Sequence, residues 1–202
     1  MLDLVWLIIA LPLAGAAVNL FGGRRLGVRA GWLGSGLVAG GFAVAVAVLL
    51  DLLSLPAEER QHVVHLFDWI AAGSFSVDIA FLVDPLSMTM TLVVTGVGAL
   101  IHVYAIGYME HDPRVGTFFA YLNLFVFFML VLVLANNYLL LYLGWEGVGL
   151  CSYLLIGFWY ERPLASSAAK KAFVTTRIGD SAMLLGIVLL ALHFPTLEFG
   201  VV

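Results

Sequence analysis

Six apolar stretches, each long enough to cross a lipid bilayer, constrain this chain more than any other feature of its sequence. They cover residues 2–21, 30–53, 84–109, 116–135, 137–160 and 166–194. A bilayer core about 30 Å thick requires about 20 apolar residues of helix, and backbone groups in lipid must be hydrogen-bonded within the segment. The sequence therefore predicts an all-α polytopic membrane protein, with one transmembrane domain of six helices over residues 1–202.

The composition agrees with a lipid environment. Hydrophobic residues make up 63% of the chain and charged residues only 11%, whereas soluble domains average about 25% charged residues. So few charges cannot cover a soluble surface, which argues against a soluble enzyme and against a nucleic-acid-binding protein. The single cysteine, Cys151, excludes an internal disulfide and a zinc or iron–sulfur site made of several cysteines of this chain.

Basic residues predict which way the helices run. If the N-terminus faces outside, only Arg60 lies in an outside connection. Seven basic residues then lie in or beside the inside connections: Arg24, Arg25, Arg29, Arg114, Arg162, Lys170 and Lys171. Because cytoplasmic connections carry the excess of lysine and arginine, we expect the N-terminus outside.

The long connection 54–83 has a pattern of its own. Apolar and polar residues alternate from Phe75 to Val83, and this period of two is typical of a β-strand. Residues 62–70 can pair with that strand across a turn at 71–74. We therefore expect a β-hairpin on the outer face, which covers helix ends and contacts a neighbouring subunit.

Three ionisable residues lie deep in the predicted membrane: Glu146, Arg177 and Asp180. A charge at mid-bilayer costs about 2.5–3.5 kcal/mol on insertion scales, so each one requires an explanation. Arg177 and Asp180 are three residues apart on one helical face. They could pair with each other and serve packing alone, or they could form a functional site with Glu146.

Glu146 is the strongest functional candidate. It lies about 14 Å into its helix at about 1.5 Å per residue, and no basic residue lies one turn away on either side. Such a carboxylate needs a partner on another helix, or else it exchanges a proton. The neighbouring glycines Gly144, Gly147 and Gly149 would let another helix or water approach closely.

Other polar residues carry weaker signals. His102 is first a packing histidine and second a proton relay, and Lys170 and Lys171 are first topology anchors and second a proton entry. The depths of His102 and His193 differ by about 25 Å, so they cannot ligate one haem. We find no phosphate-binding loop, catalytic triad or zinc motif, and we expect no cofactor or metal in this chain.

The segment 104–160, which contains GWEGVGLCSYLLIGFW, closely resembles the antiporter-like membrane subunits of respiratory complex I. The nearest resemblance is to subunit L, called chain 5 in mitochondria. DPLSMTMTLVV (84–94) and AAKKAFVTTRIGD (168–180) resemble the same family. The first 80 residues resemble it only loosely.

This resemblance implies proton translocation, coupled to electron transfer from NADH to quinone in other subunits. FMN, iron–sulfur clusters and quinone then belong to those subunits, the adjacent antiporter-like subunit M is the expected neighbour, and the bacterial inner membrane is the expected location. The family's fifth-helix glutamate falls on Glu146, and its sixth-helix arginine and aspartate fall on Arg177 and Asp180. In the family the glutamate is coupled to a seventh-helix lysine, so we expect this chain to be the N-terminal part of a longer one.

Two alternatives remain open at this point. The first is the corresponding subunit of a multisubunit sodium/proton antiporter, which shares the same core. The second is a purely structural piece of the distal membrane arm, in which the deep charges only hold helices together.

Overall fold

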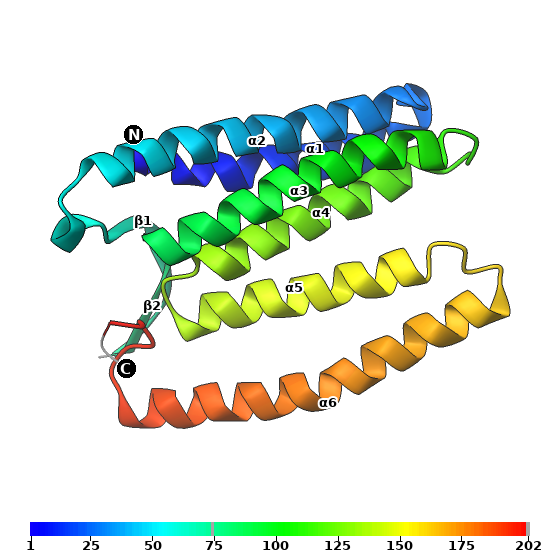
Figure 1. Ribbon diagram of the computed structural model, residues 1–202. Coiled ribbons are helices and arrows are strands. Elements are labelled where there is room, and N and C mark those ends of the chain that lie inside the picture. Colours follow the sequence, from blue (N-terminus) through cyan, green and yellow to red (C-terminus); the bar gives the residue numbers. More distant parts are fainter. Residues whose placement is uncertain (74, 201–202) are drawn as a thin grey trace.

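The computed structural model describes residues 1–73 and 75–200 of the chain, with the side chain of Ala72 excepted. Six long helices lie roughly side by side, and a two-stranded sheet lies across one end of them (Figure 1). The helices are α1 Val5–Leu26, α2 Arg29–Ser54, α3 Pro85–Met109, α4 Val115–Leu134, α5 Tyr138–Ile156 and α6 Pro163–His193. The predicted six-helix architecture is thus confirmed, and all six helices are long and apolar enough to cross a membrane.

The helix ends differ from the predicted ends where local chemistry overrides hydropathy. Helix α1 continues through Arg24 and Arg25 to Leu26, because cations are favourable in a last helical turn, and Gly27 at φ 55° then ends it. Helix α5 ends at Ile156 rather than at residue 160, and Pro163 begins α6 earlier than predicted. Proline suits the first position of a helix, where its missing N–H has no partner to lose.

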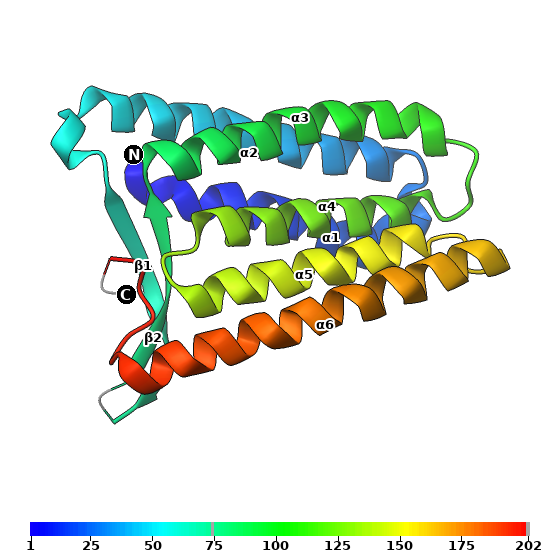
Figure 2. The same ribbon diagram turned by 60° about the horizontal axis from the view of Figure 1, so that its bottom comes forward.

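The predicted hairpin is present. Strand β1 (His62–Ala72) pairs antiparallel with β2 (Phe75–Val83), from His62 opposite Val83 to Ala72 opposite Phe75. Of the turn expected at 71–74, Ser74 lies outside the described residues. Figure 2 shows the hairpin crossing the end of the bundle where the N-terminus and residues 194–200 also lie. Its contact with a neighbouring subunit stays a prediction.

The main core lies among α1–α4. Its buried members include Ile8, Val38, Met88 and Leu130, one from each of these helices. Helix α6 differs, because only Ala169, Asp180 and Ile187 are buried among its 31 residues. It lies at the edge of the bundle beyond α5, its main helical neighbour (Figures 1 and 2).

Candidate functional site

The deep charges meet where α5 and α6 face each other at mid-length. Arg177 of α6 forms an ion pair with Glu146 of α5, through Nη1 and Oε2. The Tyr142 hydroxyl, one turn before Glu146, donates a hydrogen bond to Oε1 at 2.7 Å. The Glu146 side chain is 18% exposed and that of Arg177 is 36% exposed. The partner that Glu146 required on another helix is therefore Arg177.

Asp180 has a different partner. Trp145 Nε1 of α5 donates a hydrogen bond to Asp180 Oδ1 at 2.8 Å, and Asp180 is only 6% exposed. The alternative in which Arg177 and Asp180 pair with each other is wrong for the described residues, among which Asp180 forms no ion pair. The reason is that both side chains extend across to α5 and meet two consecutive residues there, Trp145 and Glu146.

Sequence reasoning missed three aromatic members of this site. Trp145 and Tyr142 are the donors just described, and the Phe173 ring lies under the Arg177 guanidinium at 4.4 Å from its centroid. A cation over an aromatic face is attracted by the ring quadrupole. One signal was available in the sequence, since Trp145 and Tyr142 flank Glu146 at one and four residues.

Two of the three neighbouring glycines bring α5 close to α4. A Cβ on Gly144 would come within 2.6 Å of the Leu132 backbone nitrogen, and one on Gly147 would overlap the Phe128 ring. A Cβ on Gly149 would meet nothing within 4 Å. The expected close approach is thus made by a helix at Gly144 and Gly147, and it holds α5 with its Trp145–Glu146 edge towards α6.

The structure does not bring His102, Lys170 and Lys171 into this cluster. His102 is 1% exposed inside the α1–α4 bundle, where its Nδ1 lies 2.8 Å from the Gly98 carbonyl oxygen and its ring lies near Phe119. Lys170 and Lys171 are exposed near the start of α6. Lys170 lies seven residues before Arg177, which is about 10 Å along the helix.

A cavity of about 760 Å³ lies beside the charge cluster, between α5 and α6. Trp145 and Asp180 line it together with the hydroxyl-bearing Ser152 and Thr176. The arrangement places two carboxylates and one guanidinium at similar depth next to a space that can hold water. Such a set of groups can bind and release protons inside a membrane.

Two family models match the chain. Residues 69–119 match "NADH-Ubiquinone oxidoreductase (complex I), chain 5 N-terminus", and residues 135–201 match "NADH:quinone oxidoreductase/Mrp antiporter, TM". NADH-quinone oxidoreductase subunit L of Mycobacterium tuberculosis is 51% identical over 195 residues, which are 96% of this chain and 31% of that one. NADH-ubiquinone oxidoreductase chain 5 of Chondrus crispus is 43% identical over 199 residues, 97% of this chain and 29% of that one. The chain thus spans about a third of the length of these relatives.

Solved structures agree on the fold. The Mrp complex from Dietzia sp. DQ12-45-1b contains a chain that superimposes with a TM-score of 0.79 at 26% identity, covering 96% of this chain and 20% of that one. An archaeal respiratory membrane complex, the membrane-bound sulfane sulfur reductase, gives a TM-score of 0.76 at 21% identity over 96% of this chain and 28% of the other.

Proposed function

We propose, from the premise that this chain belongs to the antiporter-like subunit L (chain 5) family of complex I, that it translocates protons across a membrane. In this proposal, the proton movement is coupled to electron transfer from NADH to quinone in other subunits. The observation that carries the proposal is the paired arrangement of Glu146 with Arg177 and of Asp180 with Trp145 across α5 and α6.

The chemistry rests on one guanidinium between two carboxylates. While Arg177 contacts Glu146, both groups are charged and stabilise each other in a medium of low dielectric. When a charge change nearby draws the guanidinium away, Glu146 is left with only the Tyr142 hydroxyl and takes up a proton. Arg177 and Asp180 share one face of α6, three residues apart, so the guanidinium can turn towards Asp180. Its return to Glu146 then releases the proton.

The proposal also assigns tasks to other subunits. The chain is a multi-pass membrane protein, and its homologues belong to multisubunit complexes. We assign FMN, iron–sulfur clusters and quinone to other subunits, and subunit M to the neighbouring place in the membrane arm. We also place the chain in a bacterial inner membrane with its N-terminus outside. The basic connections, which lie at the end of the bundle opposite the hairpin, support that orientation (Figure 1).

Replacing Glu146 by Gln in the assembled complex tests the function. Glutamine keeps the shape and can accept from Tyr142, but it cannot exchange a proton, so we expect fewer protons translocated per NADH oxidised in membrane vesicles. Glu58→Gln, at an exposed position near the hairpin, is the matched control and should pump normally. Normal pumping by an assembled Glu146→Gln complex would instead support a purely structural role.

Membership of a sodium/proton antiporter is the second candidate function. The 26% identical chain of the Mrp complex and the second family model, whose description names both kinds of protein, favour it. Purification of the native assembly separates the two. Flavin and iron–sulfur subunits should accompany the chain if it belongs to complex I, and only small membrane subunits should accompany it if it belongs to an antiporter.

A further inference from the structure

We propose that protons reach the Glu146–Asp180 cluster from the end of the bundle opposite the hairpin, through two cavities that meet at Tyr153. This inference rests on the proposed function and adds an entry route and a positioning residue to it. Neither the family models nor the named relatives assign a role to Tyr153.

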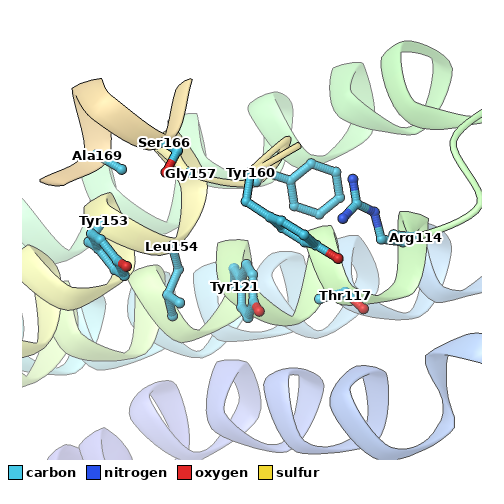
Figure 3. A pocket seen from close by; sticks show the side chains of 10 residues that line it. Arg114, Thr117, Tyr121, Tyr153, Leu154, Gly157, Tyr160, Ser166 and Ala169 are labelled. Carbon is cyan, nitrogen blue, oxygen red and sulfur yellow. The ribbon is translucent and has the colours of Figure 1, made fainter. Parts of the chain in front are cut away.

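The first cavity has a volume of about 330 Å³ and lies among α4, α5 and the start of α6. Its lining is rich in hydroxyl groups, contributed by Thr117, Tyr121, Tyr153, Tyr160 and Ser166. Figure 3 shows Tyr121, Tyr153 and Tyr160 arranged around this space. A cavity with several polar partners is a site where water can be ordered.

An ion pair lies at the outer edge of the first cavity. Arg114, which lines the cavity, contacts Glu161 with Nη1 and Oε1 2.9 Å apart, and its guanidinium lies 5.0 Å from the ring centroids of Phe158 and Tyr160. Hydrogen bonds from its own backbone N–H and from Arg114 lower the pKa of Glu161. Both groups are therefore ionised at neutral pH, and an exposed ion pair keeps water at the mouth.

Tyr153 joins this cavity to the larger one. It lines both the first cavity and the space of about 760 Å³ that reaches Trp145 and Asp180. Tyr153 lies seven residues beyond Glu146 on α5, about two turns or 10 Å along the helix. Between Tyr153 and Asp180, the hydroxyls of Ser152 and Thr176 face the larger cavity, and they can support a chain of water molecules.

The Tyr153 hydroxyl suits a relay because it both donates and accepts a hydrogen bond. A hydronium ion in the first cavity gives a proton to Oη, while the proton already on Oη passes to water in the second cavity. Tyr153 is unchanged at the end, and the excess proton continues to the Asp180 or Glu146 carboxylate. The alternative is a packing role, since the Tyr153 ring also lies 5.3 Å from the Phe173 ring.

Cysteine labelling in the complete complex tests the route. In a Cys151→Ala background, Ser166→Cys reports on the first cavity and Thr176→Cys on the second. We expect a membrane-impermeant cationic methanethiosulfonate to label both positions from the Lys170 side of the membrane. Adding Tyr153→Trp, which fills the junction with a larger ring, should abolish labelling of Thr176→Cys and leave that of Ser166→Cys intact.

Labelling of Thr176→Cys only from the hairpin side, no labelling of it, or equal labelling with Trp at 153 would overturn the route. A second variant separates the relay from packing. Tyr153→Phe keeps the ring and should lower proton translocation per NADH several-fold and shift its pH profile, less than the ~10²–10⁴ of a positioned acid or base because water can bridge. Tyr104→Phe, at a position that is 75% exposed on α3, is its control.

The two proposals fail separately. If Glu146→Gln pumps normally while labelling follows the expected pattern, the proposed function is wrong and the water path stands. If Glu146→Gln abolishes pumping but Tyr153→Phe has the pumping and pH profile of Tyr104→Phe, the function stands and the relay through Tyr153 is wrong.

Discussion

Replacing Arg177 by methionine isolates the electrostatic part of the mechanism. Methionine is long, flexible and apolar, so it fills much of the same space and keeps a favourable sulfur contact with the Phe173 ring. Within residues 1–73 and 75–200, Arg177 is the only cationic side chain in ion-pair contact with Glu146. The substitution therefore removes one charge and leaves the rest of the site in place.

The magnitude follows from the geometry of the pair. Two unit charges about 4 Å apart attract by about 4 kcal/mol at an effective dielectric constant of 20. Removing one partner of a fully buried pair costs about 3–5 kcal/mol, and the partial exposure of Glu146 and Arg177 lowers that to about 2–3 kcal/mol. Protonation relieves this penalty, so we expect Glu146 to be neutral at pH 7 in the Arg177→Met variant.

Infrared difference spectroscopy of the assembled complex provides the assay, because a protonated carboxyl group has a carbonyl band that a carboxylate lacks. The band should appear in Arg177→Met and vanish in the double variant that also carries Glu146→Gln. Arg177→Lys keeps the charge and should show no band. Proton translocation should be lost in Arg177→Met and partly kept in Arg177→Lys. An assembled Arg177→Met complex with an ionised Glu146 would refute the reasoning.

Two further predictions concern the packing that presents this site. Gly147→Ala places a methyl group against the Phe128 ring and should destabilise the assembled complex by about 1–3 kcal/mol, seen as a lower thermal midpoint, whereas Gly149→Ala meets open space and should not; equal midpoints would contradict the close approach of α5 and α4. Trp145→Phe removes the hydrogen bond to the buried Asp180 and should cost about 1–3 kcal/mol. Asp180→Asn should leave Trp145 its acceptor and cost less, and the reverse order of the two midpoints would show that the Trp145 bond does not stabilise Asp180.

Much of the architecture was accessible from the sequence because it depends on local patterns. The length and apolarity of six segments predict six helices, since backbone groups in lipid leave few other solutions. The alternation from Phe75 to Val83 predicts a strand because successive side chains in a strand point to opposite faces. Errors were confined to helix ends, such as Leu26 and Ile156, where caps and single glycines or prolines decide the boundary.

The members of the candidate site were also accessible, but their partners were not. Depth along a helix can be counted, so Glu146, Arg177 and Asp180 stand out as costly charges in a membrane. Which of them pair depends on how α5 and α6 are rotated about their axes, and hydropathy alone does not reveal that rotation. The pairing of Arg177 with Glu146 was therefore not predicted, and neither was the donor role of Trp145.

The sequence by itself determined the number of helices, the hairpin and the depth of three charges, because each of these follows from residues near in the chain. Only the tertiary structure decided the contacts between helices. Gly144 and Gly147 allow α5 to approach α4, which turns Trp145 and Glu146 towards α6 and leaves two cavities joined at Tyr153. These contacts arise from close packing between segments, and close packing is a property of the assembled bundle.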